Sequence, residues 1–163
     1  MFSEIKKISS LLLSVAFSSI GFIASITVTV LAAREVSSNP LFVGFPNAVG
    51  VGGAVLGTRM IYLISKTNSQ LNALAFTFLI GAFGGAIMFY SLIIDSFLLL
   101  LLGAFILGIG QSATLQTRYA ASFVAGTKFK ATALSLAVWF SVFGSVFGPR
   151  MVGSYSNLSL IHI

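Results

Sequence analysis

The sequence has no cysteine and very few charged residues. Asp, Glu, Lys and Arg together make up 7% of its 163 residues, whereas a soluble domain has about 25%. The chain therefore cannot present a polar surface to water on all sides. The absence of cysteine excludes disulfides, a thiol nucleophile and a thiolate metal site. Hydrophobic residues instead make up 57% of the chain, with a mean hydropathy of +1.05. This composition indicates that the solvent is largely lipid.

Acidic residues are also scarce, and their positions exclude the usual catalytic constellations. Glu4, Glu35 and Asp95 lie near segment ends on both predicted sides of the membrane, so they cannot form a carboxylate pair or a metal site. His162 stands alone. The glycine run at residues 50–57 lies inside an apolar stretch and lacks the Lys-Ser/Thr ending of a phosphate-binding loop. We therefore predict no enzyme activity, no metal and no cofactor.

Long apolar stretches are the main feature that is present. A helix needs about 20 apolar residues to cross the hydrocarbon of a bilayer, and short polar links separate stretches of that length. The predicted spans are residues 11–33, 41–64, 73–94, 97–123 and 131–152, with a cytoplasmic head at 1–10 and a tail at 154–163. These features predict an all-α integral membrane protein with five transmembrane helices in one bundle. A signal peptide at 11–33 is the alternative for the first span, although its apolar region would be longer than the usual ~7–15 residues.

The basic residues predict the orientation. A net charge of +6 suggests nucleic acid in a soluble protein, but here the charges occur singly or in pairs at span ends, which argues against a nucleic-acid partner. Arg34 and Arg150 fall on one side of the predicted bundle. The other side holds Lys6, Lys7, Arg59, Lys66, Arg118, Lys128 and Lys130. This bias predicts a protein of the plasma (inner) membrane with a cytoplasmic N-terminus and the lipid bilayer as its surroundings.

Small residues follow helical spacing in the first three spans. In the first span the series is Ser14, Ser18, Gly21, Ser25 and Thr29. Two interpretations remain open for it: close helix packing by small residues, or a polar stripe that lines a water-filled cavity. For the glycines at 50–57, and for Gly81 and Gly85 as a GxxxG pair, packing against neighbouring helices is the favoured interpretation.

The fourth span becomes polar toward its end. Gln111, Thr114 and Arg118 are spaced i, i+3 and i+7, so they share one helix face. An arginine at the centre of a span costs about 2.5–3.5 kcal/mol on insertion scales and should face protein or water. Arg118 either marks the cytoplasmic end of the helix or lies inside it, where it can pair with a substrate anion or backbone carbonyls.

The fifth span ends in a glycine–proline pattern. Gly144 and Gly148 fall on one face and permit close contact with a partner helix, while Pro149 removes a backbone donor and predicts a kink. Trp139 lies in the middle of the span, where an indole usually needs a hydrogen-bond partner. We therefore expect Trp139 to face protein.

Together these patterns resemble the N-terminal half of a major facilitator superfamily transporter. The cytoplasmic N-terminus, the basic links after the second and fourth spans and the glycine–proline ending all match; Ser135 lies nine positions before Gly144, as a small residue does in the fifth-helix motif of the drug:proton antiporters. The ending of the fourth span also matches, through Gly108, Gly110, Gln116, Arg118, Tyr119, Ala120 and Ala121.

The chain departs from the family pattern in three ways. The link between the second and third spans carries Lys66 but none of the acids and arginines of the family signature, and Ala104 stands where proton antiporters have an arginine. Proton coupling through that arginine therefore does not carry over. The superfamily has twelve spans, and the tail does not look like the start of a sixth. We interpret the chain as truncated after the fifth helix, and keep open that its last residues are non-native.

The resemblance implies secondary active transport of a small organic solute by alternating access, with or without a coupling ion, as a permease or an efflux protein. Ser18, Ser25 and Gln111 would face the cavity, with Thr114 on the same face as Gln111 and Arg118 near the cytoplasmic mouth. Gly144, Gly148 and Pro149 would shape the interface with the missing C-terminal half. The alternative is a small non-transporting membrane protein, such as an accessory subunit or assembly factor.

Overall fold

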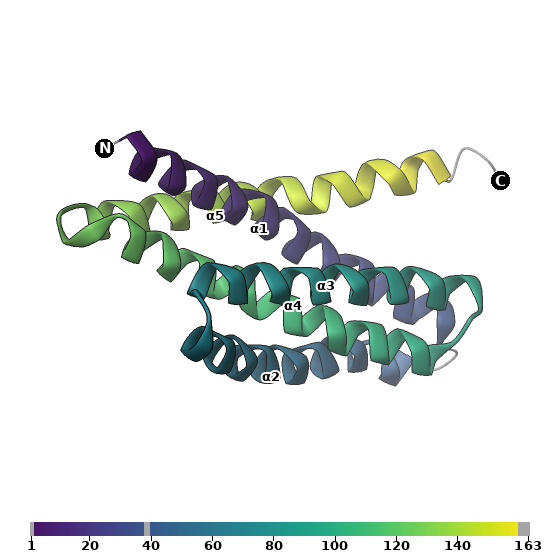
Figure 1. Cartoon of the computed structure of the whole chain (residues 1–163). Helices are drawn as coiled ribbons and strands as arrows, with labels where there is room; N and C mark the ends of the chain where they lie inside the picture. Colours follow the sequence, from purple (N-terminus) through teal and green to yellow (C-terminus); the bar gives the residue numbers. More distant parts are fainter. Residues whose placement is uncertain (1, 38–39, 160–163) are drawn as a thin grey trace. The chain divides into compact units, whose positions relative to one another are not determined.

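The computed structural model describes residues 2–37 and 40–159, and its regular structure there is all helical (Figure 1). No β-strand occurs in these two ranges, which confirms the predicted all-α class. The elements in chain order are α1 (Phe2–Val36), the 3-10 helix η1 (Pro40–Phe42), α2 (Phe45–Thr67), α3 (Gln70–Ile93), α4 (Phe97–Val124) and α5 (Gly126–Ser159).

Four helices are long and apolar enough to cross a membrane. The candidate spans are Leu12–Val36, Phe45–Thr67, Gln70–Ile93 and Phe97–Val124, with mean hydropathies of 2.0, 1.4, 1.9 and 2.0. In the described part of α5 the apolar stretch, Phe129–Val142, is shorter. Four of the five predicted membrane spans are thus matched by helices long and apolar enough to cross a bilayer, while the fifth, at 131–152, stays a prediction.

The helix ends differ from the predicted links at two places. Helix α1 already begins at Phe2, so the predicted head is helical from that residue on. The basic link predicted between the fourth and fifth spans is part of α5 from Gly126 on, and Ala125 alone separates α4 from α5. Gly126 has φ 69°, a left-handed conformation that glycine adopts at little cost. The connection between α4 and α5 is therefore shorter than the link that we predicted, and it uses the left-handed glycine at its end.

The chain divides into two compact units, and each is described by itself. The central unit is Val28–Leu115, and the terminal unit comprises Met1–Thr27 and Gln116–Ile163. Both divisions fall inside a helix, one in α1 and the other in α4.

In the central unit, α4 packs against α2 with backbone against backbone. A methyl group on Gly108 would collide with the carbonyl oxygen of Gly50, and one on Gly53 would collide with that of Phe105. A methyl group on Gly57 would lie 2.6 Å from the carbonyl oxygen of Ile109. The packing role predicted for the glycines of α2 is therefore confirmed for Gly53 and Gly57, whereas a methyl group on Gly52 would meet nothing within 4 Å.

Helix α3 packs against α4 in the same way, but with a different register from the predicted one. A methyl group on Gly81 would lie 2.7 Å from the Cα of Gly110, and one on Gly84 would collide with the backbone nitrogen of Leu107. A methyl group on Gly85 would meet only the Cδ1 of Leu107, at 4.0 Å. The predicted Gly81–Gly85 pair is thus wrong: the contact uses Gly81 and Gly84.

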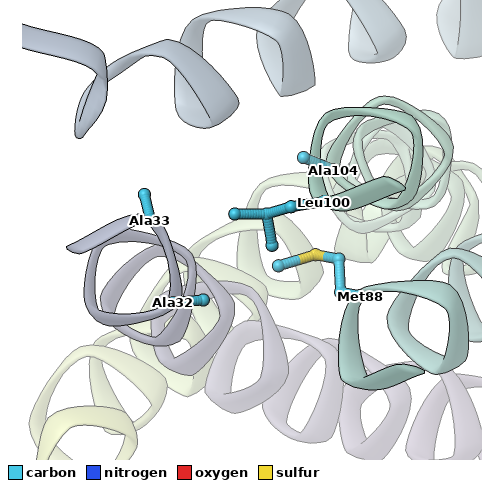
Figure 2. Close-up of a cluster of buried hydrophobic side chains, with 5 residues drawn as sticks. All are labelled: Ala32, Ala33, Met88, Leu100 and Ala104. Carbon is cyan, nitrogen blue, oxygen red and sulfur yellow. The ribbon is translucent and has the colours of Figure 1, made fainter. Parts of the chain in front are cut away.

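An apolar cluster joins three helices of the central unit (Figure 2). Ala32 and Ala33 come from α1, Met88 from α3, and Leu100 and Ala104 from α4, and all are at most 6% exposed. Figure 2 shows the side chains of Met88 and Leu100 beside each other. The cluster attaches the last turns of α1 to α3 and α4 mainly through small side chains.

The buried side chains of the terminal unit are also small. Ala120, Ala121, Ala133 and Ala137 are at most 4% exposed. Trp139 is 67% exposed, so the prediction that it faces protein is wrong. Because successive helical residues are about 100° apart, the residue two positions after Ala137 points away from the buried face of α5.

Candidate functional site

The predicted pathway residues fall on two helices and in both units. Gln111 and Thr114 lie one turn apart on α4 in the central unit, while Ser18, Ser25 and Arg118 belong to the terminal unit. Helix α4 is continuous from Phe97 to Val124, so Gln111, Thr114 and Arg118 are carried by a single helix, as predicted.

The two serines of α1 donate their hydroxyl hydrogens to their own helix. Ser18 Oγ donates to the carbonyl oxygen of Val15 at 3.2 Å, and Ser25 Oγ donates to that of Phe22 at 2.7 Å. Both side chains are half-buried. A hydroxyl that donates in this way satisfies its own hydrogen within the helix.

The polar end of α4 is more enclosed than the sequence suggested. Thr114 is 4% exposed and Gln111 is half-buried. Two further buried polar residues, Ser112 and Thr117, are each 1% exposed, and Ser112 Oγ donates to the carbonyl oxygen of Ile109 at 2.7 Å. Sequence analysis did not select this pair, because small hydroxyl side chains in an apolar helix do not reveal which face is buried.

Arg118 combines partial burial with an unused hydrogen-bond donor. Its side chain is half-buried, and its Nε is buried with no hydrogen-bond partner among the residues that the structure describes. A buried donor without a partner costs about 1–3 kcal/mol, and more if the group is charged. The guanidinium has five N–H donors in a planar fork, which matches a carboxylate or phosphate oxygen pair.

Ser19 is a second buried polar residue without a partner, and sequence analysis did not select it. It lies on α1 in the terminal unit, is 3% exposed, and its Oγ makes no hydrogen bond within the described part of the chain. The sequence signal for Ser19 was its position four residues after Val15, which places both residues on one face of α1. Val15 is fully buried. That signal becomes useful only when the buried face of α1 is known.

The glycine–proline motif lies inside a helix. Helix α5 runs from Gly126 to Ser159 and so includes Gly144, Gly148 and Pro149, but the surroundings of these residues lie outside what the structure describes. The predicted kink and interface at this motif therefore remain predictions. Across the described residues, His, Cys, Asp and Glu form no group of three or more that could hold a metal ion.

A hollow of about 580 Å³ lies on the central unit, but it is not the predicted solute site. Its lining is apolar apart from Ser96 and includes Val49 of α2, Ile94 beyond α3, and Leu98 and Phe105 of α4. None of the predicted pathway residues lines it. With so few polar groups, this hollow has little with which to orient a polar solute.

Two curated proteins of Bacillus subtilis (strain 168) are similar to this chain over most of its length. The uncharacterized MFS-type transporter YdeG is 31% identical over 148 residues, which cover 91% of this chain and 34% of YdeG. The uncharacterized MFS-type transporter YddS is 32% identical over 154 residues, which cover 94% of this chain and 35% of YddS. The chain therefore spans about a third of the length of these curated relatives. No family model matches the chain, and no solved structure matches it significantly.

Proposed function

Because the chain belongs to the major facilitator superfamily, we propose that it contributes helices to a secondary active transporter for a small organic solute. The observation that carries this proposal is the similarity to two MFS-type transporters over 91% and 94% of the chain. It confirms the resemblance predicted from the sequence. The helices long and apolar enough to cross a membrane support the same function. Since both relatives are named transporters, we propose a transport role rather than a catalytic one.

In the proposed transporter, Ser18 and Ser25 on α1 and Gln111 and Thr114 on α4 line the solute pathway. Hydroxyl and amide groups are the polar side chains that orient an uncharged or weakly polar solute in an otherwise apolar site. The polar residues of α4 lie in its C-terminal half, after a long apolar stretch. Their position supports a solute pathway beside that half of the helix.

Arg118 contacts an anionic group of the solute or carbonyl oxygens of a neighbouring helix. Its buried Nε, which has no partner within the described ranges, supports this role more than that of a membrane anchor. An anchoring arginine extends its guanidinium to water and headgroups, where every donor is satisfied.

The orientation and energy source also form part of the proposal. The bias of the basic residues supports a cytoplasmic N-terminus in the plasma membrane. An ion gradient drives transport, as in other secondary transporters. Because the relatives are about three times as long as the matched part, we expect transport to require helices beyond the ones described here.

The function is tested by expressing the full reading frame that contains this chain in transporter-depleted cells. The intracellular levels of a defined panel of small organic solutes are measured by mass spectrometry, with and without an uncoupler that collapses the proton gradient. A second arm replaces the proton gradient with a sodium gradient. We expect at least one solute to change level with expression and to lose that change when the driving gradient is removed.

The rival function, a non-transporting accessory protein, predicts a different result. In that case no solute level responds to expression, and the protein instead co-purifies with a partner membrane complex in stoichiometric amount. A stable, folded protein that gives this result would refute the transport proposal.

A further inference from the structure

The last turns of α2 present two positive charges and an aromatic ring on one exposed face. Arg59, Tyr62 and Lys66 are spaced i, i+3 and i+7, so they project from the same side of the helix. All three are exposed, Tyr62 by 60%. The Nζ of Lys66 lies 4.6 Å from the centroid of the Tyr62 ring. These three residues are called the basic face of α2 below.

The contact with Tyr62 brings the two charges closer than their spacing suggests. Arg59 and Lys66 are separated by about 10.5 Å along the helix axis. Because the ammonium of Lys66 lies over the ring of a residue one turn earlier, it is drawn back toward Arg59. Two like charges that are drawn together repel each other, and an anion bound between them would offset this repulsion.

The central unit has no acid at this end of α2 that could supply such an anion. The acids of the central unit are Glu35 and Asp95, and the sequence between them contains no acidic residue. Glu35 precedes α2 and Asp95 follows α3, so both lie at the end of the unit where α2 begins. The basic face lies at the other end, where α2 finishes at Thr67 and α3 starts at Gln70. The two cations therefore have no acidic partner within the central unit.

We propose that the basic face of α2 binds the headgroup phosphate of an anionic phospholipid. Helix α2 is a candidate membrane span, and the end of a span lies at the level of the headgroups. Tyrosine is enriched at this level because its ring is apolar and its hydroxyl is polar. A lysine stacked on that ring and an arginine below it offer a phosphate two cations from one side. Each basic residue near an anionic membrane surface adds about fivefold to the affinity.

The proposal is tested on the whole purified protein by native mass spectrometry in a non-ionic detergent. Phosphatidylglycerol is titrated against phosphatidylcholine with the same acyl chains, and apparent dissociation constants are compared. We expect the R59Q/K66Q double variant to bind phosphatidylglycerol about 25-fold more weakly than the parent, close to the level of phosphatidylcholine. A K66R variant keeps the charge and should stay within about threefold of the parent.

Arg34 provides the matched control. It is an exposed arginine in the last turn of α1 and lies outside the basic face of α2. R34Q should leave the phosphatidylglycerol preference unchanged. The proposal is overturned if R59Q/K66Q keeps the preference of the parent, or if R34Q loses as much of it. Equal thermal midpoints for all variants would show that loss of binding is not loss of fold, and lipid binding is read without any transport measurement.

Discussion

In the central unit, three helices touch backbone against backbone, whereas in the terminal unit two buried polar atoms have no partner among the described residues. Seven glycines between Gly50 and Gly110 leave too little room for a methyl group: Gly53, Gly57, Gly81, Gly84, Gly103, Gly108 and Gly110. The unpartnered atoms of the terminal unit are Ser19 Oγ and Arg118 Nε.

This difference separates the two kinds of role that small and polar residues have in a membrane helix. Close backbone approach is the main source of helix association where lipid removes the hydrophobic driving force. A buried polar atom without a partner instead reduces stability by about 1–3 kcal/mol. The central unit is therefore held by close helix contacts, whereas the terminal unit has two buried polar atoms without a partner among the described residues, which we propose a solute satisfies.

The largest expected effect comes from adding a methyl group where α2 and α4 meet. G108A would place its Cβ against the Gly50 carbonyl oxygen, and because both groups are backbone the helices must separate. We expect a loss of about 3 kcal/mol in the free energy of unfolding, measured by denaturant titration in detergent.

Gly52 is the matched control for this substitution. It lies on α2 two residues from Gly50, and its Cβ would meet nothing within 4 Å. G52A should be neutral or raise stability by up to about 1 kcal/mol, because alanine is the better helix former. Equal losses for G108A and G52A would show that α2 and α4 do not pack as described.

Two adjacent glycines of α3, Gly84 and Gly85, test the packing of α3 against α4, with a smaller expected loss of stability than for G108A. G84A should cost about 2 kcal/mol, because its Cβ would collide with the backbone of Leu107. G85A should cost almost nothing, because the nearest atom is the flexible Cδ1 of Leu107 at 4.0 Å. The two unfolding midpoints are compared side by side. The GxxxG pattern predicts the reverse order, so the pair decides between the sequence register and the structural one.

This pair also illustrates how much of the fold the sequence could predict. The number of helices and the all-α class follow from the length of the apolar stretches, which the bilayer sets. The register of helix contacts does not, because Gly81, Gly84 and Gly85 are equally small and only the position of α4 selects among them. Trp139 was misjudged for the same reason: its burial depends on which face of α5 the neighbours cover.

The candidate site was predictable to a similar extent. Arg118 stood out because a charge in an apolar helix is costly wherever it lies, and its unpartnered Nε is consistent with that expectation. Ser19 was missed because a serine costs little in either position, so the sequence cannot distinguish a buried hydroxyl from an exposed one. A charged residue in a membrane helix can thus be recognised as a candidate site from the sequence alone. For a hydroxyl residue, the positions of the neighbouring helices must be known first.

Arg118 tests whether the unpartnered donor serves transport. Removing a hydrogen bond to a charged group costs about 1.5–3 kcal/mol, so R118A should reduce uptake of the identified solute by about 10- to 150-fold. R118K keeps the charge without the planar fork and should retain an intermediate rate. R34Q, which changes an exposed arginine in the central unit, should leave uptake within twofold. Unchanged uptake in R118A would reduce Arg118 to a membrane anchor.

The smallest expected effects have opposite signs at two serines of α1. Ser25 donates a hydrogen bond to Phe22 at 2.7 Å, so S25A should lower the free energy of unfolding by about 0.5–1 kcal/mol. Ser19 has a buried hydroxyl without a partner among the residues that the structure describes, so S19A should remove an unsatisfied group and raise stability by about 1 kcal/mol.

A transport measurement on S19A then distinguishes two roles of the Ser19 hydroxyl, solute binding and packing. If it binds the solute, S19A makes the protein more stable and lowers uptake, a combination that a packing role cannot produce. If S19A instead destabilises the protein, the hydroxyl is satisfied in the membrane by a group outside the described residues. In that case the contrast between the central and terminal units would rest on Arg118 alone.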